Sequence, residues 1–167
     1  MNKASMICAY VIAFLLKPVL DGIIPGNMGT GNILLCLTSV LVFLYDEYVP
    51  VILTGTVFAL LDDLVYGLYC GPEALGTLAV CCAIITAKYI FNNENYVNAF
   101  IVLIVSTWLA YSVEWGVYHF AGVTYSYAYM LKSIPVSVIV NTVIGMVVYF
   151  VLHNRIRKRR YDKYYDR

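Results

Sequence analysis

The chain has 167 residues, of which 62% are hydrophobic and 13% are charged, and its mean hydropathy is +0.78. Such a composition leaves too little polar surface to coat a water-soluble globule, so it predicts a single all-α domain integral to a membrane. The formal net charge is +1, and the one dense basic run lies at the C-terminus, which argues against nucleic acid as a partner.

Six apolar segments approach the length of about 20 residues that a helix needs to cross a hydrocarbon core roughly 30 Å thick. They cover residues 4–24, 31–45, 48–69, 72–91, 97–120 and 129–153, and the second is the shortest. The connections between them are too brief for a soluble domain. Residues 1–154 are therefore predicted to form one bundle of about six transmembrane helices, and residues 155–167 a basic tail.

The orientation is predicted from the bias of Lys and Arg toward the cytoplasmic side of a membrane. Five basic residues follow the last apolar segment closely: Arg155, Arg157, Lys158, Arg159 and Arg160. They place the C-terminus in the cytoplasm. With six crossings, the N-terminus is then cytoplasmic too.

Two adjacent carboxylates, Asp62 and Asp63, lie near the end of the third apolar segment. An ionisable side chain at membrane depth costs a few kcal/mol or more unless it faces protein or water, so it is a candidate functional position. At a rise of about 1.5 Å per residue, both aspartates fall in the outer half of the bilayer. The same count brings four further ionisable residues to this level: Lys17, Asp21, Glu114 and Lys132.

Small and polar residues recur at every fourth position of several segments, a spacing that lets membrane helices approach closely. The stripes include Gly55, Ala59, Asp63 and Gly67 in the third segment and Ser137, Asn141 and Gly145 in the sixth. Because Asp63 lies on a stripe, we expect its carboxylate to pair with a lysine or hydroxyl inside the bundle. Asp62 points about 100° away, toward a different helix, a partner or a neighbouring Tyr.

Two interpretations of this polar cluster remain open from the sequence. The cluster either fixes the register of the helices or forms a site for a ligand or partner. Hydrolase, phosphate-loop and zinc-protease motifs are absent, and the two aspartates point in different directions, so we expect neither an enzyme nor a cofactor.

Three short stretches carry a resemblance to a known family: residues 58–67, residues 71–75, and residues 141–149 before the basic tail. Together they resemble the rod shape-determining protein MreD family. Asp63 matches the aspartate of that family's Leu-Asp-Leu motif, and Asn141 matches its Leu-Asn-Leu motif. Gly71, Ala74 and Leu75 match a small-Gly-x-x-Ala-Leu motif. Glu114 lies near a Tyr-Glu pair that is adjacent in the family and separated by two residues here.

The resemblance implies a non-enzymatic scaffold of the bacterial cell-elongation machinery in the cytoplasmic membrane. Its partners would be MreC and, through it, MreB, RodA and a class B penicillin-binding protein. The MreD fold is also similar to the substrate-binding subunits of energy-coupling-factor transporters, which gives an alternative function in vitamin or metal-ion uptake. In those subunits an Ala-x-x-x-Ala pattern docks the transporter module, and this chain has Ala9 and Ala13.

Overall fold

The computed structural model describes residues 3–23, 31–89, 95–123 and 126–165, and within these ranges it contains helices and turns but no strand. The helices are α1 (Lys3–Ile23), α2 (Ile33–Leu44), α3 (Val49–Tyr66), α4 (Pro72–Ala87), α5 (Tyr96–Phe120) and α6 (Tyr127–Tyr165). Each corresponds to one apolar segment predicted from the sequence. The all-helical prediction is confirmed.

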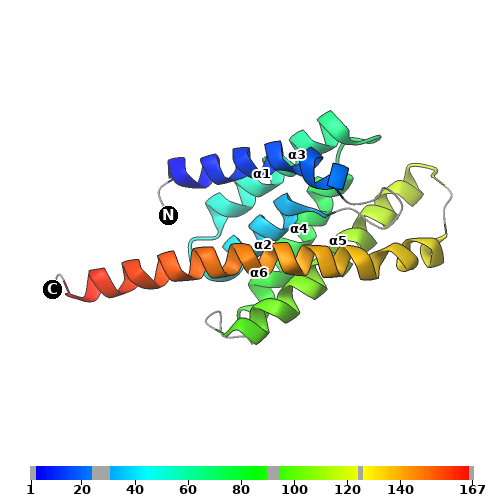
Figure 1. Ribbon diagram of the computed structural model, residues 1–167. Helices are drawn as coiled ribbons and strands as arrows, with labels where there is room; N and C mark the ends of the chain where they lie inside the picture. The colour runs from blue at the N-terminus through cyan, green and yellow to red at the C-terminus, as the bar shows by residue number, and fades with distance from the viewer. Residues whose placement is uncertain (1–2, 24–30, 90–94, 124–125, 166–167) are drawn as a thin grey trace.

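The short helix α2 lies at the centre of the bundle, where it packs against each of the other five helices (Figure 1). Every residue from Leu34 to Leu44 is buried. This explains why the sequence of α2 is apolar on all sides rather than along one face. At 12 residues, α2 is only about 18 Å long, well short of a membrane crossing of its own.

Among the described residues, three helical segments are long and apolar enough to cross a membrane: α3, α5 and the part of α6 from Ile134 to His153. Shorter apolar helices make up the rest, namely Ala4–Leu20 within α1, α2 and α4. These lengths support a membrane protein. The six crossings predicted from the sequence remain a prediction.

Small residues bring neighbouring helices close together at two of the predicted positions. A Cβ atom added to Gly55 would lie 2.6 Å from the Thr38 side chain, and one added to Gly145 would lie 2.5 Å from a methyl carbon of Leu103. The helices α2 and α3, and likewise α5 and α6, therefore approach too closely at these positions for any residue larger than glycine.

The other three packing predictions have mixed outcomes. Ala59 and Ser137 are buried, as a stripe that faces the bundle requires. Gly67 is instead an exposed residue at the C-cap of α3, so its predicted place in a helix interface is wrong. The stripe ends at Gly67 because the helix itself ends there.

The last helix extends well past the apolar segment predicted at 129–153 and continues through Tyr165. At 39 residues it is about 58 Å long, so its C-terminal part projects beyond the bundle (Figure 1). The backbone of the predicted basic tail is thus helical up to that residue. The start of α1 and the end of α6 lie toward the same end of the bundle (Figure 1).

Candidate functional site

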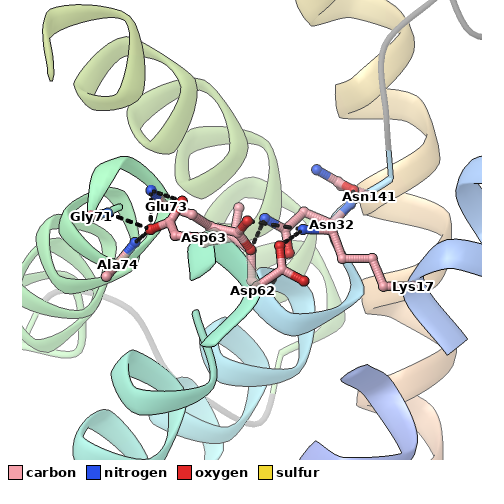
Figure 2. A network of polar contacts seen from close by, with 9 residues as sticks. Lys17, Asn32, Asp62, Asp63, Gly71, Glu73, Ala74 and Asn141 are labelled. Carbon is pink, nitrogen blue, oxygen red and sulfur yellow. Dashed lines mark hydrogen bonds and ion pairs between the residues drawn. The ribbon is translucent and has the colours of Figure 1, made fainter. Parts of the chain in front are cut away.

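A buried polar network joins α1, α2, α3, α4 and α6 at one level of the bundle (Figure 2). At its centre the Lys17 ammonium from α1 donates to Asp62 on α3 and to Glu73 in the first turn of α4, the latter at 2.9 Å. Lys17 and Glu73 side chains are 11% and 12% exposed, and that of Asp62 is 3% exposed. One lysine therefore holds two carboxylates from two different helices out of solvent.

The neighbouring Asp63 has a different role, because it accepts hydrogen bonds from backbone N–H groups at the start of α4. Its Oδ2 accepts from Gly71, Glu73 and Ala74, each at 3.1 Å, and its Oδ1 accepts from Glu73 at 3.2 Å. The first N–H groups of a helix have no partner within the helix, and they favour an anion. Asp63 thus caps α4 from the end of α3.

The turn between α3 and α4 makes this capping possible. Gly71 stands at the N-cap of α4 and has no side chain to accept these bonds. Its φ of 116° lies in the left-handed region that glycine adopts at little cost. The chain can therefore reverse tightly enough to aim the start of α4 at the Asp63 carboxylate.

Two asparagines extend the network to the central helix and to α6. Asn32 caps α2 by accepting from the Leu35 N–H at 2.9 Å, and its amide group donates to Glu73 at 2.8 Å. The Asn32 N–H donates in turn to the Asn141 side chain at 2.7 Å. Asn141 is fully buried. It therefore ties α6 to the start of α2.

The predicted site residues divide into those that the structure brings together and those that it does not. Lys17, Asp62, Asp63 and Asn141 all belong to the network. Glu114 lies within electrostatic reach of Lys17 and both aspartates, yet among the described residues it makes no ion pair. Lys132 is exposed and lies outside the network. Asp21 lies on α1, but its side chain is outside the part that the structure describes.

The structure corrects the partners expected for the two aspartates. The residue on the stripe, Asp63, pairs with no described lysine, and its oxygens instead accept hydrogen bonds from the backbone of α4. The lysine partner belongs to Asp62, which faces α1 as a residue turned about 100° from the stripe can do. Both carboxylates are buried, with residue exposures of 2% for Asp62 and 5% for Asp63.

Two members of the network, Glu73 and Asn32, were not among the predicted site residues. Each carried a local signal in the sequence. Glu73 follows Pro72 at the start of an apolar run, where an acidic residue in the first helical turn is favoured. Asn32 directly precedes another apolar run, where asparagine is a preferred cap.

A second charged contact lies at the other end of the central helix. Lys88, the C-cap residue of α4, donates to the carbonyl oxygens of Tyr45 at 2.6 Å and Val42 at 3.2 Å. These carbonyls belong to the last turn of α2 and its C-cap, where a helix has unpaired acceptors and favours a cation. Lys88 thus stabilises the C-terminal end of α2.

No protein-family model, curated protein or solved structure matches this chain. Among the described residues, no group of three or more His, Cys, Asp or Glu side chains has the arrangement to hold a metal ion. A groove of about 70 Å³ lies between α4 and α5, and it is apolar, with Ala83, Ala87 and Val105 among its lining. It falls below the roughly 300 Å³ at which small-molecule sites usually begin.

Proposed function

We propose that this protein is a non-enzymatic scaffold of the bacterial cytoplasmic membrane that acts in cell elongation through MreC. The proposal includes six membrane crossings and both termini in the cytoplasm. MreC would connect it to MreB, RodA and a class B penicillin-binding protein. The proposal rests on the resemblance of three sequence stretches to the MreD family and on how those stretches meet.

The observation that carries the proposal is the contact between two of these stretches. Asp63, which matches the Leu-Asp-Leu motif, accepts hydrogen bonds from Gly71 and Ala74, which match the small-Gly-x-x-Ala-Leu motif. Asn141, which matches the last motif, accepts from the start of α2 in the same network. Residues that look unrelated along the sequence therefore have a common structural task, which is a reason for a family to retain them together.

The outer faces of the bundle suit a protein whose activity is binding within a membrane. Ile12, Leu15 and Val19 are exposed on α1, and Ile139 and Val143 are exposed on α6. Meanwhile the charged side chains of the network turn inward and bind one another. Apolar faces on a bundle with a fixed interior can meet lipid or the transmembrane helix of a partner such as MreC.

The alternative function, substrate binding for an energy-coupling-factor transporter, receives less support from the same contacts. Ala13 is buried inside the bundle and Ala9 packs against its core. The Ala-x-x-x-Ala pattern on α1 is thus used within this chain, whereas docking of a transporter module needs it on the outside.

Co-purification with MreC tests the scaffold directly. The tagged protein, extracted in mild detergent from cells that also express MreC of the same genome, should recover MreC. Its depletion from a rod-shaped host should cause rounding and lysis. Normal rod shape after complete deletion, together with lost uptake of one vitamin, would instead establish the transporter function.

The proposed topology has its own test. A cysteine added after Arg167, in a variant without the five native cysteines, should react with a membrane-impermeant maleimide only after the cells are opened. A cysteine in the turn between α3 and α4, at Leu68, is the matched position expected on the outside, since Leu68 is 91% exposed. Labelling of the C-terminal cysteine in intact cells would contradict the topology.

A further inference from the structure

The buried network has more negative charge than the structure neutralises. Within the part of the chain that the structure describes, Lys17 is the one cation that contacts Asp62 and Glu73, and it faces both. Asp63 is satisfied by the backbone N–H groups of α4. With both of its carboxylates ionised, the site around Lys17 would keep one net negative charge among apolar helices, where an uncompensated charge is costly.

One oxygen in this site lacks a partner. Asp62 Oδ2 accepts from Lys17, but Oδ1 is buried and accepts no hydrogen bond from any described residue. A buried carboxylate oxygen without a donor is among the more expensive groups that a protein can contain. The Asp62 and Glu73 carboxylates both contact the Lys17 ammonium, so the two carboxyl groups lie close to one another. A proton on one of them would therefore supply the missing donor.

A metal ion explains the unpartnered oxygen less well than a proton does. The described residues contain no group of three or more acidic, His or Cys side chains arranged to hold a metal. The Lys17 ammonium already stands between the two carboxylates and would repel a second cation. A proton needs neither a coordination shell nor additional space.

We propose that Asp62 and Glu73 bind one proton between them, so that the site is a carboxylic acid hydrogen-bonded to a carboxylate beside Lys17. The proton comes from water and lies between Asp62 Oδ1 and an oxygen of Glu73. The site then has no net charge: one ammonium faces one carboxylate and one neutral acid. This inference concerns the bundle itself and does not depend on the proposed partners.

The described surroundings of the pair contain several negative or neutral polar groups and one cation, Lys17. No other described side chain that contacts Asp62 or Glu73 carries a positive charge. The nearby carboxylates oppose a second negative charge at the pair. The charged and polar groups around the pair are Lys17 from α1, Asn32 at the start of α2, Asp63 on α3 and, through Asn32, Asn141 from α6, while Glu114 from α5 packs against α4 at Gly76.

Infrared difference spectroscopy on the whole protein in lipid nanodiscs tests the proposal. At neutral pH the wild-type protein should show the carbonyl stretch of a protonated carboxyl group, and this band should shift in heavy water and disappear at alkaline pH. Asp62→Asn and Glu73→Gln should each abolish it, because a shared proton needs both partners. Glu114→Gln, which changes a nearby carboxylate outside the pair, should retain it.

Several results would overturn the proposal. A wild-type spectrum without the band at neutral pH would do so whether or not the variants fold. A band that survives in Asp62→Asn would assign the proton to Glu73 alone, and one that is lost in Glu114→Gln would assign it to Glu114. Loss of the band on adding sodium at constant pH would show a metal-cation site instead.

The pH dependence of unfolding gives a second readout. If the folded protein holds this proton near neutral pH while the unfolded chain does not, the folded state binds more protons, and stability falls as the pH rises. The unfolding temperature of the wild type should therefore decrease from neutral to alkaline pH. Glu73→Gln, which cannot release a proton there, should show a smaller decrease, and an equal decrease in both proteins would contradict the proposal.

Discussion

Replacing Asp63 by leucine is expected to destabilise the bundle by removing the cap of α4. Leucine has the same branching and number of side-chain heavy atoms but no acceptor, so the N–H groups of Gly71, Glu73 and Ala74 would all lose their partner. Gly71 is partly exposed, and water can replace its lost bond. The N–H of Ala74, a buried residue, and that of Glu73 have less access to water.

The expected magnitude follows from these two N–H groups. An unsatisfied buried donor costs about 1 to 3 kcal/mol, so Asp63→Leu should lower the free energy of unfolding by about 2 to 6 kcal/mol. Asp63→Asn can keep one oxygen in the place of Oδ2, which makes three of the four bonds. It loses mainly the charge facing the helix N-terminus, a cost of about 1 kcal/mol.

Asp62→Leu is the matched control, because it changes the adjacent carboxylate to the same side chain. It removes one of the two acceptors of Lys17 and leaves Glu73 in place. We therefore expect a smaller loss than for Asp63→Leu. Thermal unfolding of the purified variants in one detergent ranks them by stability. Membrane abundance and MreC recovery are measured alongside. A wild-type unfolding temperature for Asp63→Leu would refute the capping role.

Two further substitutions test the core of the bundle by the same unfolding measurement. Gly55→Ala would place a methyl group 2.6 Å from the Thr38 side chain and should cost about 1 to 3 kcal/mol. Gly116→Ala, where nothing lies within 4 Å, should unfold at or above the wild-type temperature, and equal effects would contradict the close approach. Lys88→Met keeps most of the side chain but removes its hydrogen bond to the Tyr45 carbonyl, so a loss of about 1 to 2 kcal/mol is expected, which Lys88→Arg should largely restore.

The sequence predicted the helices and much of the network because both follow from local patterns. Apolar runs placed all the helices, and the cost of burying charge singled out Lys17 and the two aspartates. The partner of Asp63 was not predictable from helical stripes, because a stripe describes which face of α3 meets other helices and not what lies just beyond its end. The tight turn at Gly71 decides that contact.

The course of the chain after residue 153 shows another limit of predicting structure from the hydropathy pattern. The apolar run ends there, so hydropathy predicted the end of the membrane segment, whereas the helix continues through Tyr165. Hydropathy reports where lipid contact stops. Helix continuation depends on backbone hydrogen bonds and on the absence of Pro and Gly, and residues 154–165 contain neither.

The helix α4 accounts for how so short a helix as α2 can lie at the centre of the bundle. Glu73, in its first turn, accepts a hydrogen bond from Asn32 at the start of α2, and Lys88, its C-cap residue, donates to the Tyr45 carbonyl at the end of α2. The two helices therefore run in the same direction, and each charge has the sign that the facing end of α2 favours.

The distance along α4 between its two charged residues also matches the length of α2. Lys88 lies fifteen positions after Glu73, about 22 Å along the helix, and α2 with its two caps is about 20 Å long. In a soluble protein water would complete the ends of such a helix, but inside a membrane the protein has to supply those partners itself. The charged residues of α4 therefore have a structural task that exists whether or not the network also binds a proton or positions a partner.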